Sequence, residues 1–383
     1  MNYKIPFIRP CYTRFYKAHR KEIDLAEQSC HKRGDYMLRS DTWKLEKNIA
    51  KFVGTKYCAS VGSGTDALFL SLLALGIGKG DEVITVSNTF IATIQAIVHT
   101  GATPILIDVG EDEQMDVSQV EGAITERTKA IIPVHYTGAM VDMDGLVRIA
   151  GEHGLYIVED ACQALGATQN GKKAGSIGTL GCFSFNNAKL LGGKEDGGAV
   201  TTNSRELYEK ICLLRNHWNV HQLSVDRNDY PQPKEMQWAW KSRLGNANAA
   251  FLNVKFKYLL WILKRREEIA ERYLKELWHM PTFYVDNYGY ELPHNEKGRI
   301  WQEFHLRIKD RDKFTKHMQK WGVETLTRDT VPNHKMPGLN LEHFNLPVTE
   351  KLAREVTRIP LHEWMTDAEV KYVIHAVKEF FNK

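Results

Sequence analysis

Short apolar runs alternate with longer amphipathic stretches between residues 57 and 202, with glycine, aspartate, asparagine and proline between them. Near-continuous apolar strands that alternate with helices indicate a mainly parallel sheet covered by helices on both faces. Strands are predicted at residues 57–61, 82–86, 103–107, 130–134, 155–158, 182–185 and 199–202. Helices are predicted at residues 65–75, 91–100 and 143–153.

The pattern changes after residue 203. A helix is predicted at 205–215, and the polar, aperiodic stretch 217–236 is typical of a long functional loop. One long helix is predicted at 247–277 as a bridge between domains. Further strands are predicted at 303–308 and 323–326, and further helices at 311–321 and 366–381, the last starting at a capping box of Thr366 and Glu369.

These elements predict an α/β protein with a mainly parallel mixed sheet. The large domain is predicted at residues 1–250, including the N-terminal segment and a substrate or dimer loop at about 217–243. A bridging helix and a small α+β C-terminal domain are predicted at residues 251–383.

Composition and charge narrow the class of protein. Hydrophobic residues make up 43% of the 383 residues and charged residues 26%, so a sizeable core can form. The net charge of +4 is spread along the chain, and no run approaches about 18 apolar residues, so neither nucleic acid nor a membrane is an expected partner. Six scattered cysteines without a C-x-x-C pair indicate free thiols. His217 and His221 have the spacing of metal ligands on a helix, but no third metal ligand of matching spacing is visible. We therefore expect a cytoplasmic protein without a metal site.

A glycine-rich turn follows the first predicted strand of the sheet. It reads Gly62-Ser63-Gly64-Thr65-Asp66-Ala67, and its backbone N–H groups at a helix start could hold a phosphate. It also matches the G-x-G-x-x-A pattern of nicotinamide-binding proteins. Those proteins place an acidic residue at the end of the second strand, whereas here Ser87-Asn88 follows it. A phosphate cup is therefore the favoured interpretation, and a nicotinamide oxidoreductase stays an alternative.

Two further segments place reactive side chains at strand ends. Asp160 follows Glu159 at the end of one predicted strand, where ligands of open α/β sheets bind. Lys189 comes five residues after Ser184, near the end of another, and a lysine there can form a Schiff base. A phosphate cup, a carboxylate for a ring nitrogen and a lysine for an aldehyde are together what pyridoxal phosphate requires. The sequence thus predicts a pyridoxal-phosphate protein.

At these residues the sequence resembles the sugar aminotransferases of the DegT/DnrJ/EryC1/StrS family, a branch of the fold-type-I pyridoxal-phosphate enzymes. The resemblance runs from about residue 34 to 260 and continues more thinly to the C-terminus. Its motifs include Val61-Gly62-Ser63-Gly64-Thr65-Asp66-Ala67-Leu68, Ser87-Asn88-Thr89-Phe90-Ile91-Ala92-Thr93, Thr100-Gly101-Ala102-Thr103-Pro104, Ile132-Pro133-Val134-His135, Glu159-Asp160-Ala161-Cys162-Gln163-Ala164 and residues 183–199.

The resemblance implies a role for each matching residue. Lys189 is implied as the Schiff-base lysine rather than Lys194, and Asp160 as the partner of the pyridine nitrogen. Phe90 would lie against the ring, and Gln163 near the phenolic oxygen. The phosphate would be held by Gly64, Thr65, Asp66 and Ser184. Lys241 occupies the position of an asparagine that reaches the neighbouring subunit's cofactor phosphate in relatives.

The resemblance also implies the activity and the partners. A homodimer with shared active sites would transfer an amino group from glutamate to a keto group of a nucleotide-linked sugar. Relatives that act as dehydratases carry histidine where this chain has Lys189, so the lysine favours amino transfer over dehydration. The nucleotide, the sugar carbon and the stereochemistry stay open. So do three alternatives: a smaller phosphorylated or cyclic ketone as substrate, a non-catalytic cofactor-binding protein, and the nicotinamide oxidoreductase.

Overall fold

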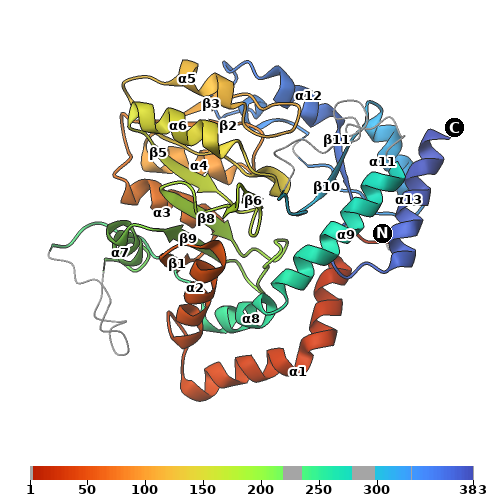
Figure 1. Ribbon diagram of the computed structural model, residues 1–383, viewed down its shortest axis with the longest axis horizontal. Coiled ribbons are helices and arrows are strands. Elements are labelled where there is room, and N and C mark those ends of the chain that lie inside the picture. The colour runs from red at the N-terminus through yellow and green to blue at the C-terminus, as the bar shows by residue number, and fades with distance from the viewer. Residues whose placement is uncertain (1–2, 219–234, 278–297, 329, 383) are drawn as a thin grey trace.

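A sheet of seven strands forms the centre of the computed structural model, which describes residues 3–218, 235–277, 298–328 and 330–382 (Figure 1). The strand order is β1-β9-β8-β5-β4-β2-β3. Only β9 runs antiparallel to its neighbours, so the predicted mainly parallel sheet is confirmed. The strands are β1 (Tyr57–Val61), β2 (Glu82–Val86), β3 (Thr103–Ile107), β4 (Thr128–Ile131), β5 (Tyr156–Asp160), β8 (Leu180–Ser184) and β9 (Gly198–Thr202). A small hairpin pairs β6 (Thr168–Gln169) with β7 (Lys172–Lys173).

Hydrophobic cores lie on both faces of this sheet, because successive side chains of a strand point to opposite sides. Ile84 and Ile157 pack in one core, with side chains of α2 (Ser40–Val53), α6 (Met143–His153) and α8 (Asn246–Phe256). Their strand neighbours Val83 and Val158 pack in the other, with α3 (Gly64–Ala74), α4 (Ala92–Thr100) and α7 (Arg205–Leu214). The short helix α5 (Val120–Ala123) and the 3₁₀ turns η1 (Val117–Gln119) and η2 (Tyr136–Gly138) complete this part.

The prediction of a single helix at residues 247–277 is wrong. The chain instead forms α8 and α9 (Leu259–Leu277). At the break the backbone tightens, because the N–H groups of Lys257 and Tyr258 bond three residues back rather than four. The two helices pack in different places: α8 lies against α1 (Arg9–Arg33) and α2, and α9 leads away towards the C-terminal helices (Figure 1). Nothing in the sequence pattern predicted α1 or α2.

The C-terminal part has a third hydrophobic core, to which α9 contributes Ile269 and Tyr273. Its strands β10 (Phe304–Arg307) and β11 (Val356–Ile359) pair antiparallel, and its helices are α11 (Arg311–Lys320), α12 (Pro347–Glu355) and α13 (Asp367–Phe381), with a 3₁₀ turn η4 (Asn333–Lys335). Thr366 and Glu369 form the predicted capping box. The strand predicted at 323–326 is wrong, because Val323 and Leu326 make only isolated bridges, to Ile5 and Arg358. A domain boundary at residue 250 stays a prediction.

Some predicted features fall on residues that the structure does not describe. Most of the predicted loop at 217–236 lies outside them, and so does His221. No helix within the described ranges is long and apolar enough to cross a bilayer.

Candidate active site

A cavity of about 370 Å³ lies at the edge of the sheet where β5 and β8 end and α3 begins. Strands β1, β5 and β8 run in the same direction, so their carboxyl ends and the segments that follow them meet at this edge. The structure therefore brings together predicted site residues that lie up to 125 positions apart, from Gly64 to Lys189. The predicted site residues that line the cavity are Gly64, Thr65, Phe90, Asp160, Gln163, Ser184 and Lys189.

The start of α3 forms one wall of the cavity. Ser63 caps the helix by accepting a hydrogen bond from the N–H of Asp66 at 3.0 Å. The first N–H groups of a helix have no acceptor inside it, and they favour an anion. Gly64 and Thr65 border the cavity at this point, beside Ser184 at the end of β8. This wall fits a phosphate group.

Gly64 is required by its neighbours. A Cβ at this position would lie 2.8 Å from the Cβ of Ser184 and 2.9 Å from Sγ of Cys162. We predict that Gly64→Ala pushes the helix start away from β8, costs about 1–3 kcal/mol of stability and lowers affinity for a phosphate-bearing cofactor. Thermal unfolding and cofactor titration measure both effects.

The matched control is Gly151→Ala within α6, where an added Cβ meets nothing within 4 Å. It should be neutral or stabilise the protein by up to about 1 kcal/mol, because alanine favours a helix more than glycine does. Equal cofactor affinity in the Gly64→Ala variant and the wild type would contradict the proposed phosphate wall.

Asp160 is a buried carboxylate that faces the cavity and is only 6% exposed. Its Oδ2 accepts a hydrogen bond from the hydroxyl of Thr93 at 2.8 Å, and its Oδ1 accepts one from the N–H of Cys162 at 3.2 Å. Both donors are neutral, and no described side chain forms an ion pair with Asp160. Because a buried charge is costly without a cationic partner, the site fits a ligand that brings a cationic N–H to this carboxylate.

The neighbouring carboxylate, Glu159, points into the other side of the sheet. It is fully buried, lies 3.0 Å from Nε2 of His135 and accepts hydrogen bonds from the N–H groups of Gly175, Ile177 and Gly178. Its acceptor sites are thus used to hold the turn before β8. The structure therefore separates a structural carboxylate from the one that is available to a ligand.

Lys189 enters the cavity from the loop between β8 and β9. The backbone N–H of Lys189 donates to the carbonyl of Asn186 at 2.9 Å, and the Asn186 side chain donates to the carboxylate of Asp196 at 2.8 Å. Lys194, the other lysine of this loop, forms an ion pair with Glu27 of α1 at 2.8 Å and does not line the cavity. Lys189 is accordingly the lysine of this loop that a ligand in the cavity would meet.

Gln163 and Phe90 complete the predicted wall. The side-chain oxygen of Gln163 accepts a hydrogen bond from the N–H of Thr137 at 3.2 Å, so its NH₂ group is the part left for the cavity. An NH₂ donor suits an anionic oxygen of a ligand. Phe90 is 63% exposed, and an apolar ring left open in this way offers a face on which an aromatic ligand could stack.

Asp66 and Lys241 are predicted site residues that do not line the cavity. Asp66 accepts a hydrogen bond from the hydroxyl of Ser242 at 2.8 Å. Lys241 is exposed, and its backbone forms a bridge with Asn216. The roles of both in cofactor binding stay predictions.

Sequence reasoning missed several residues of the cavity: Thr93, Cys162, Asn186 and Arg328. Thr93 lies on α4 and touches Asp160, although the Thr-Phe-Ile-Ala-Thr motif drew attention only to its phenylalanine. Burial, followed by the charge of Asp160, raises the pKa of the Cys162 thiol well above its usual value, so this thiol stays neutral. Arg328 comes from the C-terminal part and carries no local motif that could have placed it here.

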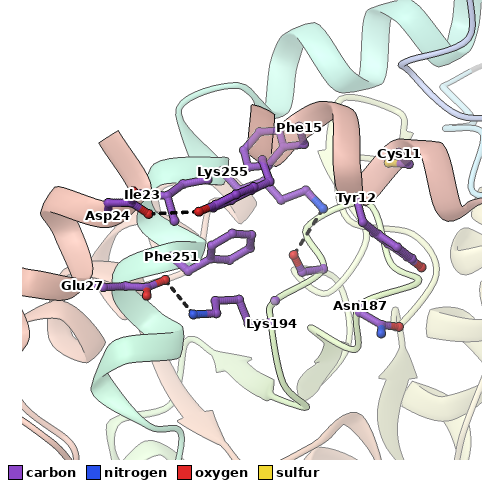
Figure 2. Close-up of a pocket in the computed structure, with 13 residues that line it drawn as sticks. Cys11, Tyr12, Phe15, Ile23, Asp24, Glu27, Asn187, Lys194, Phe251 and Lys255 are labelled. Atoms are coloured by element: carbon purple, nitrogen blue, oxygen red, sulfur yellow. Dashed lines mark hydrogen bonds and ion pairs between the residues drawn. The ribbon is translucent and has the colours of Figure 1, made fainter. Parts of the chain in front are cut away.

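A second cavity, of about 590 Å³, lies between α1, α8 and the far side of the loop that bears Lys189 (Figure 2). Aromatic side chains of α1 and α8, among them Phe15 and Phe251, form much of its wall. It is larger than the first, but it lacks the strand-end carboxylate, the helix start and Lys189. Within the described ranges, no cluster of histidine, cysteine, aspartate and glutamate could hold a metal ion.

Comparisons with known proteins give matches that cover nearly the whole chain. The DegT/DnrJ/EryC1/StrS aminotransferase family matches residues 17–378. The chain is 36% identical to dTDP-3-amino-3,6-dideoxy-alpha-D-galactopyranose transaminase of Aneurinibacillus thermoaerophilus, over 94% of this chain and 96% of that one. It is 33% identical to UDP-2-acetamido-2-deoxy-3-oxo-D-glucuronate aminotransferase of Pseudomonas aeruginosa, over 93% and 95%. The crystal structure of DesV from S. venezuelae with a ketimine intermediate superposes with a TM-score of 0.88 at 35% identity, covering 100% of this chain and 99% of that one.

Proposed function

The chain belongs to the DegT/DnrJ/EryC1/StrS aminotransferase family, and from this premise we propose that it transfers an amino group from glutamate to a keto group of a nucleotide-linked sugar. It is an aminotransferase, and aminotransferases of this family depend on pyridoxal phosphate. The observation that carries the proposal is one cavity that holds a lysine, a helix start and a strand-end carboxylate with no ion-pair partner among the described residues. A nicotinamide-dependent or a non-catalytic protein is not favoured.

Pyridoxal phosphate, when bound, supplies an aldehyde that condenses with amines and a ring that accepts an electron pair. In our proposal the N–H groups of Gly64 and Thr65 and the hydroxyl of Ser184 hold its phosphate. The NH₂ of Gln163 donates to its phenolic oxygen, and Phe90 covers one ring face. Asp160 keeps the proton on the ring nitrogen, which maintains the ring's capacity to accept electrons.

Lys189 has two tasks in this proposal. Its Nζ anchors the cofactor covalently before the donor amine displaces it. The released Nζ would then move the proton from the α-carbon of glutamate to the carbon of the cofactor aldehyde. In the second half-reaction it would move a proton from that carbon to the sugar carbon that gains the amino group. The sequence of two half-reactions needs one amine that reaches both reacting carbons.

The presence of Arg328 in the cavity supports an amino donor with a carboxylate side chain, such as glutamate. Arg328 lines the cavity, and its Nη1 lies 3.4 Å from Oε1 of Glu303. Burial by itself would raise the pKa of Glu303. The positive charge of Arg358, 2.5 Å away, together with the hydrogen bond to His305 and the charges of Arg328 and His305, lowers this pKa overall and keeps Glu303 ionised. Glu303 is the only ion-pair partner of Arg328 among the described residues, so with respect to these residues most of the five N–H donors of Arg328 stay available to a carboxylate.

We predict that Arg328→Gln raises KM for glutamate about 10- to 100-fold, since a charge-assisted hydrogen bond contributes about 1.5–3 kcal/mol. Arg328→Lys keeps the charge but loses the planar fork, so it should give an intermediate KM. Initial rates at varied glutamate and fixed sugar measure the effect. A rise in KM for the sugar alone would assign Arg328 to the other substrate.

The proposed substrate class is tested with a panel of nucleotide-linked keto sugars and glutamate, read by the mass of the product. Relatives named for a dTDP-linked 3-amino sugar and a UDP-linked 3-oxo sugar support including both nucleotides and a ketone at carbon 3. The panel adds ketones at another ring carbon for comparison. A smaller cyclic ketone serves as the comparison. We expect an amino sugar from at least one nucleotide-linked ketone and none from the small ketone. The reverse outcome would refute the proposal.

We also propose a cytoplasmic homodimer with shared active sites. Lys241 is exposed and lies outside its own chain's cavity, and Trp238 and Trp240 beside it are 99% and 51% exposed. Mixing inactive Lys189→Ala protein with Lys241→Ala protein should restore about a quarter of the wild-type activity, because half of the dimers would then carry one intact site of two. A monomeric mass in solution, or no recovery after subunit exchange, would contradict shared sites.

A further inference from the structure

The loop that carries Lys189 has no helix or strand to fix its shape. It covers residues 185–197, between the end of β8 and the start of β9. A lysine on such a loop needs side chains from elsewhere to set its direction, because a misplacement of about 1 Å can cost about 10²-fold in rate. The contacts made to this loop therefore decide how well Lys189 is placed.

Gln302 bonds to the backbone on both sides of Lys189. Its side-chain NH₂ donates to the carbonyl of Ala188 at 2.9 Å, and its side-chain oxygen accepts from the N–H of Leu190 at 3.3 Å. These two groups belong to the two peptide units that join Lys189 to the chain. One amide thus limits rotation on both sides of the lysine Cα.

Gln302 is itself held rigidly. It is 6% exposed, and its N–H donates to the carbonyl of Thr137 at 3.2 Å. Its carbonyl accepts from Nη1 of Arg266 at 3.0 Å, and Nε of the same arginine lies 2.9 Å from buried Glu363. The N–H of Thr137 donates to the side-chain oxygen of Gln163. The backbone of Thr137 therefore contacts both Gln302 and Gln163, the amide predicted to bind the cofactor.

Other side chains hold the far half of the loop. Asn248 of α8 accepts from the N–H of Lys194 at 3.0 Å and donates to the carbonyl of Asp196 at 3.1 Å. Lys255, also on α8, donates from Nζ to the carbonyl of Gly192 at 3.2 Å, beside the second cavity (Figure 2). These contacts fix residues that lie three or more positions beyond Lys189. They are comparable to those of Gln302 in kind, but they do not act on the peptide units of the lysine.

We propose that Gln302 is a positioning residue that directs the Lys189 amine into the cofactor cavity. The inference rests on the proposed role of Lys189 and adds a contribution from the C-terminal part of the chain. It requires no contact between Gln302 and the substrate. Its consequence is that the reactivity of Lys189 depends on an amide 113 positions away in the sequence.

The test compares Gln302→Leu with Asn248→Leu, two buried amides replaced by an apolar side chain. Cofactor-free protein is mixed with pyridoxal phosphate, and the covalent link to Lys189 is followed by absorbance and by mass after borohydride reduction. Gln302→Leu should slow formation of the link and lower kcat, each about 10- to 100-fold, with KM for both substrates within about threefold of wild type. Asn248→Leu should lower thermal stability similarly and change the link rate less than about threefold.

Link rates within threefold of each other in the two variants would overturn the proposal. Should Gln302→Leu not fold, Gln302→Glu replaces it: the carboxylate keeps the bond from Leu190 but faces the Ala188 carbonyl without a donor, and the same slowing is expected. The link rate needs no keto sugar. A failure of the proposed sugar substrates would therefore show in the product panel while the test of Gln302 still gives its answer.

Discussion

Replacement of Lys189 by alanine should lower the rate of amino transfer by at least about 10²- to 10⁴-fold, because the variant loses the group proposed to carry the proton. The cavity wall otherwise stays in place, since the walls formed by α3, β5 and β8 do not depend on this side chain. Steady-state kcat with glutamate and the accepted sugar measures the loss. A small primary amine in solution should restore part of the rate, because it can take over the proton transfer.

Lys194→Ala is the control for this variant. It removes a lysine five positions away that pairs with Glu27 on the other side of the loop. It should keep kcat within about threefold, since an exposed ion pair contributes little. A large loss in Lys194→Ala together with an active Lys189→Ala variant would show that the lysines are assigned the wrong way round.

The second large effect is expected from Asp160→Asn. Asparagine keeps the size and can still accept from Thr93, but it cannot stabilise a positive charge on a ring nitrogen. We expect kcat to fall about 10²- to 10³-fold, as when one preorganised electrostatic contact is removed from an active site. The measurement is kcat at saturating cofactor, so that weaker cofactor binding does not enter the result.

Asp196→Asn tests whether any negative charge at this edge of the sheet can account for the effect of Asp160 on kcat. Asp196 lines the same cavity and contacts Asn186, so its replacement removes the same unit of charge without touching the strand-end site. Its effect on kcat should be at least tenfold smaller than that of Asp160→Asn. Equal losses in the two variants would mean that net charge, rather than a specific partner for the ring nitrogen, explains the role of Asp160.

Much of the sheet could be predicted because its strands are continuous apolar runs between turn residues. β1, β2 and β3 have the predicted bounds, and the other strands of the sheet differ by a few residues at their ends. The break between α8 and α9 could not be predicted, since no proline or glycine marks it. It follows from where the two helices pack, which is a tertiary property.

The candidate site was predictable where its residues follow strands in sequence. Gly64, Asp160, Ser184 and Lys189 all lie within five residues of a strand end, so one motif identifies each of them. Arg328, which lines the cavity, and Gln302, which bonds to the backbone beside Lys189, carry no such signal, because both come from the C-terminal part of the chain. The partner of Asp160, Thr93, was inside a recognised motif, but only the structure shows the hydrogen bond between them.

The most direct test of the central claim is to locate the covalent bond between protein and cofactor. The protein loaded with pyridoxal phosphate is reduced with borohydride and digested, and the peptide that gains the mass of the reduced cofactor is sequenced. We predict a single modified residue, Lys189. Modification of Lys194 or Lys255 instead, or of no lysine, would contradict the active site described above.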